Sequence, residues 1–273
     1  MMHGSVWSSS GHMLPHSSEH HINSQIISRF QARHLAPACK SLAREVLSKP
    51  QRMKIDETED RFFYDYPRLV KHVDDGFIAQ VTELYRQRIP AGGAVLDLCS
   101  SWVSHLPPEV EYSKVVGHGM NAAELARNER LDSFFVRNLN REPDGWAVAD
   151  CTYDAVICCV SVQYLQQPER VFQEIHRVLK PGGVAIFTFS NRMFYGKAIA
   201  AWREGNDYAR VQLVKQYFQC AEGFTVPEVL KQLKGPGASA PQNSLSKILK
   251  DLLVVLTGAL PDPFFAVLSY KES

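Results

Sequence analysis

The sequence predicts an α/β fold built on a doubly wound, mostly parallel sheet. From residue 51 onward, short apolar runs alternate with segments of helical periodicity. The runs are apolar at nearly every position, which is typical of strands covered on both faces. The chain has 273 residues, 45% of them hydrophobic and 22% charged, which suits one large globular domain with an extension.

The first helix and strand of this domain are predicted from residues 74–98. Asp74 and Asp75 can cap a helix that runs to about Arg88. Its apolar residues, spaced three or four apart, are Phe77, Ile78, Val81, Leu84 and Tyr85. The sequence Pro-Ala-Gly-Gly at 90–93 ends the helix, and residues 94–98 then form a buried strand with Asp97 near its end.

The alternation of strands and helices continues to the end of the chain. Apolar runs predict strands at 114–118, 133–137, 153–159 and 184–189, and a closing strand at 262–270. Helices are predicted at 121–130, with Asn121 as N-cap, at 169–179, which a Pro-Gly-Gly turn at 181–183 ends, and within 191–218. Residues 192–261 contain a cap or insertion, with a Gly- and Pro-rich loop at 235–241 and an amphipathic helix at 247–256.

Three stretches, at residues 95–98, 153–165 and 171–189, resemble a known family. The last contains Glu-Ile-His-Arg-Val-Leu-Lys-Pro-Gly-Gly, a helix that enters a proline-glycine turn before a strand. Their order resembles the class I S-adenosylmethionine-dependent methyltransferases, especially the type 11 group that acts on small molecules. The resemblance covers about residues 60–190 and the last strand. It implies a Rossmann-like methyltransferase fold of about seven strands, with the last one antiparallel, and S-adenosylmethionine as cofactor.

The cofactor loop departs from the family pattern. Members usually carry D-x-G-x-G-x-G after the first strand, because glycine lets the backbone approach the cofactor and adopt positive φ. Residues 97–103 read Asp-Leu-Cys-Ser-Ser-Trp-Val, so the acid is kept and all three glycines are replaced. Pro107 and Pro108 prevent the usual long helix from continuing past His105. This helix is therefore expected to be short, shifted or absent.

Two further family landmarks are altered. Gly119 stands where the family usually has an acid for the ribose hydroxyls, and His118 or Asn121 could replace that acid as single hydrogen-bonding groups. Asn138 stands where an Asp usually meets the adenine amino group, and an amide oxygen can accept the same bond. The resemblance thus implies a set of cofactor-binding residues: Asp97, Cys99, Ser100, Ser101, His118, Gly119, Met120, Asn138, Leu139, Cys159 and Val160.

Residues for a substrate or a lid are expected before the first strand and after the fourth. The candidates are Tyr64, Tyr66, Arg68, Gln163 and Tyr164. The aromatic residues near 64–72, His72 among them, could instead only pack the N-terminal segment on the sheet. Tyr164 and His105 are the candidates for catalysis, although a single His in a loop is more often polar surface.

Two functions stay open on the sequence. The first is a methyltransferase that acts on a small molecule, and the second is a non-catalytic methyltransferase-like binding or assembly protein. A cavity bounded by Asp97, Ser101, Met120 and Tyr164 would favour the first, whereas Trp102 lying across the cofactor position would favour the second. A nucleotide-binding oxidoreductase is disfavoured because G-x-G-x-x-G is missing.

Composition excludes several other classes. Thirty basic residues stand against 29 acidic ones, so the net charge favours neither nucleic acid nor an anionic membrane as partner. The six cysteines form no CxxC pair, and the histidines near the N-terminus lack further ligands at metal spacing, so no metal site is expected. The longest apolar stretch, 248–260, is too short and too charged to span a membrane.

Residues 1–50 differ from the rest of the chain. They contain ten Ser, six His and five Lys or Arg, with only Glu19 and Glu45 as acids. Basic, Ser-rich and acid-poor composition is typical of an organelle transit peptide, for a chloroplast or mitochondrion. A disordered tail on a cytoplasmic protein is the alternative. The methyltransferase-like domain is expected to occupy residues 51–273.

Overall fold

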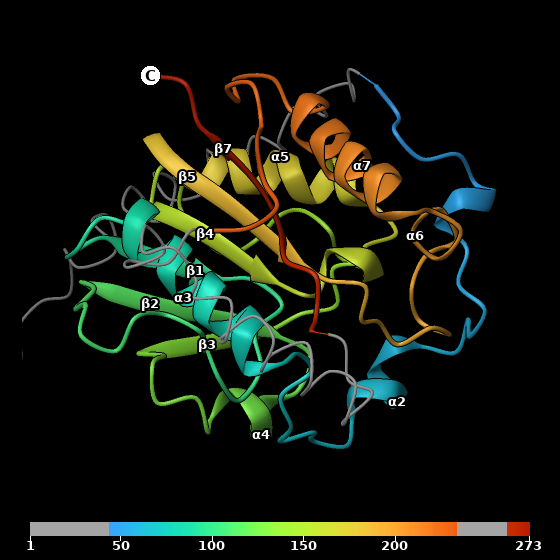
Figure 1. Ribbon diagram of the computed structural model, residues 1–273, viewed down its shortest axis with the longest axis horizontal. Coiled ribbons are helices and arrows are strands. Elements are labelled where there is room, and N and C mark those ends of the chain that lie inside the picture. Colours follow the sequence, from blue (N-terminus) through green and yellow to red (C-terminus); the bar gives the residue numbers. More distant parts are fainter. Residues whose placement is uncertain (1–43, 234–260) are drawn as a thin grey trace, which may run out of the picture. The chain divides into compact units, whose positions relative to one another are not determined.

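The computed structural model describes residues 44–233 and 261–273, which form a seven-stranded sheet flanked by helices (Figure 1). The strand order is β3-β2-β1-β4-β5-β7-β6. The helix expected at 247–256 and the loop expected at 235–241 lie outside the described residues. None of the helices in the described part of the chain is long and apolar enough to cross a membrane.

The sheet confirms the predicted fold class. Its first five strands are mutually parallel, and β7 runs antiparallel to both of its neighbours. The strands are β1 (Ala94–Asp97), β2 (Lys114–Gly119), β3 (Ser133–Val136), β4 (Tyr153–Cys159), β5 (Leu179–Phe189), β6 (Glu228–Leu230) and β7 (Phe265–Tyr270).

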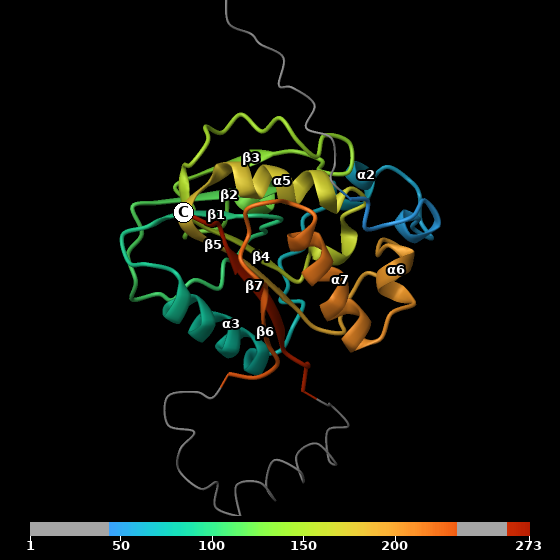
Figure 2. The same ribbon diagram turned by 90° about the horizontal axis from the view of Figure 1, so that it is seen from above.

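Helices cover both faces of the sheet. The helices are α2 (Asp60–Tyr64), α3 (Asp75–Arg88), α4 (Ala122–Leu125), α5 (Pro168–Val178), α6 (Ala200–Arg203) and α7 (Asp207–Gln219), with short 3₁₀ turns η1 (Pro50–Arg52) and η2 (Val162–Tyr164). Figure 2 shows α3 on one face and α5 with α7 on the other. Two separate apolar clusters, one under α3 and one under α5 and α7, bury the two faces.

The predicted caps are present. Asp74 Oδ1 accepts the Phe77 N–H at 2.7 Å, and Asn121 Oδ1 accepts the N–H groups of Ala123 and Glu124 at 2.9 and 3.0 Å. The apolar stripe of α5 is fully buried, because its spacing turns every third or fourth residue toward the sheet.

Several elements differ from the sequence prediction. Residues 98–113 form no helix, as the two prolines led us to expect. Helix α4 has four residues where ten were expected. Strand β5 starts at Leu179 rather than 184, because the Pro-Gly-Gly turn is a bulge within it: the register passes from Tyr153 opposite Leu179 to Ala155 opposite Val184. Strand β3 lies at the sheet edge and is mostly exposed, so covering on both faces was wrong for this strand.

The packed part of the chain includes residues that precede the expected boundary at 51. Leu47 is buried in the core, and the N–H groups of Val46 and Leu47 donate to Glu169 Oε1 at 2.9 and 3.1 Å. The guanidinium of Arg52 makes a two-pronged ion pair with the same carboxylate, at 2.7 and 2.8 Å. The start of α5 therefore anchors this segment from residue 46 onward.

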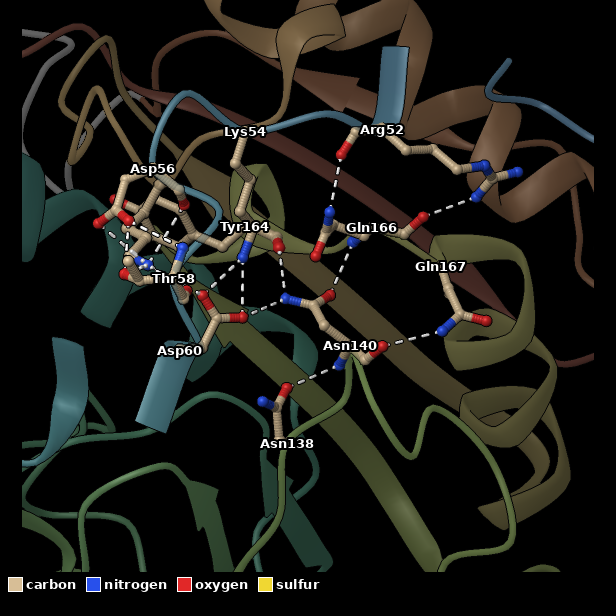
Figure 3. Close-up of polar contacts among 11 residues, drawn as sticks. Arg52, Lys54, Asp56, Thr58, Asp60, Asn138, Asn140, Tyr164, Gln166 and Gln167 are labelled. Atoms are coloured by element: carbon tan, nitrogen blue, oxygen red, sulfur yellow. Dashed lines mark hydrogen bonds and ion pairs between the residues drawn. The ribbon is translucent and has the colours of Figure 1, made fainter. Parts of the chain in front are cut away.

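A buried ionic cluster fixes the next part of the N-terminal segment (Figure 3). Lys54 Nζ lies 2.8 Å from both oxygens of Asp60, and Lys197 Nζ lies 3.7 Å from Asp60 Oδ1 and 3.1 Å from Asp56 Oδ2. Lys197 also donates to the Thr58 carbonyl at 2.7 Å. Burial lowers the pKa of Lys54, and the contact with Asp60 opposes that shift. Asp60 thus balances Lys54 and, together with Asp56, the buried ammonium group of Lys197.

We expect Asp60→Asn to destabilise the protein by about 3–5 kcal/mol at neutral pH, because it leaves the buried Lys54 without its counterion and Lys197 with Asp56 alone. Urea denaturation followed by circular dichroism measures the change. Asp150→Asn is the control, since the Asp150–Arg177 pair is at the surface and should contribute at most about 0.5 kcal/mol. Equal effects of the two substitutions would refute the role given to Asp60.

Candidate functional site

A cavity of about 320 Å³ opens at the carboxyl ends of β1, β2 and β4. It lies where the strand order reverses between β1 and β4, which is the usual ligand position in open α/β sheets. Its volume is within the range of small-molecule sites. Its walls are the N-terminal segment 60–73, the loop 97–105, the strand ends at 118–121, 137–140 and 157–165, and residues 192–194.

Nearly all residues predicted for the site line this cavity. The lining includes all eleven expected cofactor residues, and also Tyr64, Arg68, His105, Gln163 and Tyr164. Tyr66 is the exception: its side chain is 79% exposed and does not line the cavity, so its role in a lid stays a prediction. Trp102 lines the wall, and its indole N–H donates to the Val70 carbonyl at 3.2 Å. The cavity stays open beside it.

Asp97 is the centre of a polar network that replaces the glycine loop. Its Oδ2 accepts the hydroxyl of Ser100 at 2.6 Å and that of Ser104. Asn128 donates to Ser104 Oγ at 2.9 Å and to the Ser101 carbonyl at 3.0 Å. Among the described residues nothing donates to Asp97 Oδ1. Burial raises the pKa of Asp97 to about 6, and the two hydroxyls act in the opposite direction.

Two non-glycine residues, which follow β1 and β4, have a positive φ angle. Cys99 has φ of 56° in the place of the first family glycine, and Val160 has φ of 49°. Such a conformation is a clear outlier for a β-branched residue and stores strain. Both residues line the cavity. The turn that the family makes with glycine is therefore retained in the backbone although the glycine is gone.

The hydrogen-bonding groups of the His118 and Asn121 side chains all have partners within the protein. The Cys99 N–H donates to His118 Nδ1 at 3.1 Å, so the ring proton is on Nε2, which donates to the Arg137 carbonyl at 2.9 Å. Asn121 caps α4 with its oxygen and donates with its nitrogen to the carbonyls of Tyr64 and Asp65. Neither side chain has a group left to replace the missing ribose acid, contrary to the sequence-based expectation.

Gly119 has a steric reason to lack a side chain. A Cβ atom built on Gly119 would lie 2.6 Å from the Ser100 carbonyl oxygen. The two backbones are held together because the Ser100 N–H donates to the His118 carbonyl at 2.6 Å. An acid cannot occupy this position while the loop keeps its course. The loss of the loop glycines and the loss of the ribose acid are thus one connected change.

Glu124 is a site residue that the sequence analysis missed. Its Oε1 accepts the Arg68 N–H at 2.7 Å and its Oε2 accepts the Ser101 hydroxyl at 2.6 Å. It lines the cavity from the first turn of α4, directly after β2. An acid three residues past the N-cap Asn121 was the available signal. Glu124 places a carboxylate near the end of β2 by another route than position 119.

Asn140 connects the cavity floor to the buried ionic cluster (Figure 3). Its Nδ2 donates to Asp60 Oδ2 at 2.8 Å and to the Tyr164 carbonyl at 3.0 Å, and its Oδ1 accepts the Gln166 N–H at 2.8 Å. Asn138 Oδ1 accepts the Asn140 N–H at 2.9 Å, which leaves one lone pair of that oxygen for a ligand.

The pKa values of Tyr164 and His105, the two residues predicted to be catalytic, do not suit a general base at neutral pH. Burial raises the pKa of Tyr164, whose hydroxyl accepts the Phe194 N–H at 2.8 Å, so the phenol stays protonated. Burial lowers the pKa of His105 to about 4, which makes it a weak base. Burial also raises the pKa of the Cys159 thiol to about 12. None of the three can accept a proton efficiently at neutral pH.

His72 is better placed to accept a proton. Its ring lies edge-on to Phe194 with 5.3 Å between centroids, and it lines the cavity. In the described part of the chain its ring nitrogens have no hydrogen-bond partner. Burial lowers its pKa below the ordinary 6.5, so the ring is neutral at pH 7. No group of three or more metal-ligating side chains occurs among the residues that the structure describes.

The strand order and the cavity at the reversal point define a Rossmann-like methyltransferase fold with a ligand site in the usual position. Residues 112–187 match the family model described as a methyltransferase domain, of type 11, which confirms the resemblance in that region. Thiol S-methyltransferase TMT1B of Rattus norvegicus is 29% identical over 85 residues, covering 31% of this chain and 32% of the rat protein. The Homo sapiens protein of that name is 37% identical over 57 residues, which cover 21% of this chain and 23% of the human protein. The chain therefore spans a third or less of the length of these curated relatives.

Solved structures with a similar fold share little sequence with this chain, and they include a [4+2]-cyclase as well as methyltransferases. A chain of the complex between the Haloferax volcanii Trm112 methyltransferase activator and the putative methyltransferase aligns with 73% of this chain and 91% of its own length, with 15% identity and a TM-score of 0.48. Phosphoethanolamine N-methyltransferase 2 of Haemonchus contortus was solved with S-adenosyl-L-methionine. It aligns with 73% of this chain and 53% of its own length, with 15% identity and a TM-score of 0.44.

We expect Gly119→Ala to destabilise the protein by about 1–3 kcal/mol, because the new methyl group would collide with the Ser100 carbonyl. Gly119→Asp should do the same and should not improve binding of S-adenosylhomocysteine. Gly196→Ala is the control, since its Cβ would only reach 3.5 Å from Asp56 Cβ, an ordinary contact. Thermal unfolding and calorimetric titration measure both effects. Tighter binding of S-adenosylhomocysteine by the Gly119→Asp variant would contradict the inference that the loop glycines and the ribose acid were lost together.

Proposed function

We propose that this protein is an S-adenosylmethionine-dependent methyltransferase that acts on a small molecule. The observation that carries the proposal is the open cavity at the β1/β4 reversal, because it gathers all eleven residues expected to hold the cofactor. The match of residues 112–187 to the methyltransferase domain supports it. When bound, the cofactor would supply an activated methyl group on a sulfonium.

The residues present fit this cofactor through an altered set of contacts. Asp97 lines the cavity, and its Oδ1, which has no donor among the described residues, suits the aminoacyl ammonium group. Asn138 keeps one lone pair for an adenine amino group. Glu124 is the carboxylate on the side of the cavity where ribose is expected, although both of its oxygens already accept one bond. A carboxylate has about four acceptor sites, so further bonds remain available.

Methyl transfer needs alignment more than chemical groups from the protein. Holding donor and acceptor in line supplies much of the rate, and a base is needed where the acceptor carries a proton. His72 is our candidate base for that proton. Phe194 and Tyr164, whose rings stack with 6.0 Å between centroids, would align an apolar acceptor.

A thiol is the acceptor class that we favour. The relatives that match this chain over 57–85 residues are named thiol S-methyltransferases. A thiol has an ordinary pKa of about 8.5, so it is mostly protonated at pH 7 and benefits from a base.

A non-catalytic binding or assembly protein is the second candidate. The replaced loop glycines and the closure of position 119 by Ser100 favour it, because both reduce the usual contacts to cofactor. Turnover of labelled cofactor with any acceptor would eliminate it. An organelle leader within residues 1–50 also stays a prediction, which microscopy of the full-length chain with a fluorescent C-terminal fusion can test against a cytoplasmic location.

Titration with S-adenosylhomocysteine tests the cofactor. Because Asp97 has a pKa of about 6, its charged form dominates above that value, so affinity should rise as pH increases from 5 to 7. Asp97→Asn should weaken binding by about 1.5–3 kcal/mol, roughly ten- to a hundredfold, and flatten this pH dependence. Asp150→Asn is the control, and calorimetry is the measurement. No binding by the parent protein at millimolar ligand would refute the proposal.

The pH profile of thiol methylation tests His72. In the parent protein the rate should rise through a midpoint below 6.5, because only the neutral ring accepts a proton. His72→Gln should lower the rate about a hundredfold at pH 7 and leave a profile that follows ionisation of the thiol near pH 8.5. His105→Gln should change the rate less than twofold. An unchanged profile in the His72 variant would exclude the imidazole as base.

A further inference from the structure

Arg68 brings a positive charge to the cavity wall. Its guanidinium carbon lies 4.3 Å from the ring centre of Phe63 and 5.6 Å from that of Phe194. Its one hydrogen bond from the side chain is long, at 3.4 Å to the Tyr66 carbonyl. Within residues 44–233 and 261–273 no carboxylate pairs with it. Most of its five N–H donors are therefore available to a ligand.

The carboxylates in the cavity wall are already engaged elsewhere. Asp60 balances Lys54 and Lys197. Asp97 accepts two serine hydroxyls and has a raised pKa. Glu124 accepts the backbone N–H of Arg68 and the Ser101 hydroxyl, which holds the segment in place but leaves the guanidinium free. The charge of Arg68 is thus not compensated by these acids.

The other basic groups in the wall are paired or neutral. Lys71 pairs with Asp75 at 2.8 Å and Arg192 with Asp262 at 2.6 Å, while Arg137 donates to the carbonyls of residues 142 and 144. Burial lowers the pKa of His72 and that of His105, and His118 accepts a backbone N–H, so these rings are neutral. Arg68 is the uncompensated cation of the described wall.

We propose that Arg68 binds an acid group of the methyl acceptor, which is a small anion with an apolar body. This inference rests on the proposed function and names its substrate class. A planar guanidinium packed against two aromatic rings is weakly hydrated and presents parallel donors that match a carboxylate. The cavity would bind the ionised acid in preference to a neutral molecule of the same shape.

Phe194 relates the acid end of the acceptor to the reacting end. Its ring lies beside Arg68 and His72 and stacks with Tyr164. An acceptor bound by its acid at Arg68 would lay its apolar body along Phe194. Its nucleophilic atom would then face His72 and the end of β4.

The cofactor's own carboxylate is the competing ligand for Arg68. The position of Arg68 does not separate the two ligands, because its guanidinium packs on Phe63 and Phe194 while its backbone N–H donates to Glu124, just after β2. If Arg68 held the cofactor instead, substitution would weaken S-adenosylhomocysteine rather than the acceptor. The two assignments are therefore distinguishable by which ligand loses affinity.

Matched acid and amide probes test the proposal on the full chain saturated with S-adenosylhomocysteine. The pairs are benzoate with benzamide, phenylacetate with phenylacetamide, and hexanoate with hexanamide, followed by calorimetry or ligand-observed NMR. At least one acid should bind about tenfold or more tightly than its amide. Arg68→Gln should abolish that preference without changing affinity for S-adenosylhomocysteine. Arg68→Lys, which keeps the charge, should retain part of it.

Arg61→Gln is the matched control. Arg61 also stacks on a neighbouring phenylalanine, at 4.6 Å from the Phe62 ring centre, but it is 70% exposed, pairs with Glu59 and does not line the cavity. Its substitution should leave the preference intact. Equal affinity for acids and amides, or a preference that survives in Arg68→Gln, overturns the proposal. Because S-adenosylhomocysteine has no methyl group to transfer, the outcome is independent of methyl transfer.

Discussion

Asp60 lies buried between two lysines that come from distant segments of the chain, and it also accepts a hydrogen bond from Asn140. An ammonium group buried without a counterion would cost several kcal/mol, so the three charged groups must come together or not be buried at all. The two ion pairs of Asp60 and its hydrogen bond with Asn140 join the N-terminal segment, the loop after β3 and the segment after β5. All three segments contribute residues to the cavity wall, so this pairing holds several parts of the site in one place.

The opposite wall depends on hydrogen bonds between the loop after β1 and the end of β2. Where the family relies on glycine, this chain keeps the turn at Cys99 and stabilises it with the imidazole of His118. Serine hydroxyls then fill the space on one side of Asp97. This wall is therefore held by internal hydrogen bonds, and Glu124 adds a carboxylate to it just after β2.

The elements with strong local signals were predictable. Apolar runs indicated β1, β2, β4 and β5, and the caps Asp74 and Asn121 are present because their side chains act within one turn of their own helix. The residues around the cavity were also predictable, because the family resemblance fixes which strand ends meet.

What the sequence could not show depends on contacts between distant residues. Helix α4 ends at Leu125, and Asn128 just beyond it donates to Ser101 and Ser104, a partner set visible only in three dimensions. The free charge of Arg68 is apparent only after every other ion pair in the wall is known. Position 119 looked like a lost acid, whereas the approach of Ser100 shows a steric requirement for glycine.

The ion pairs of the N-terminal segment also set an order in which the protein can be assembled during synthesis. Arg52 and Lys54 leave the ribosome early, but Glu169 and Lys197 follow only after most of the sheet has been made. Such long-range pairing is slow to form, because the loop must close before any contact offsets its entropy. The part of the chain that covers the cavity is translated first and docks late. A ribosome-bound chain that ends before Lys197 would expose an incomplete pocket to chaperones.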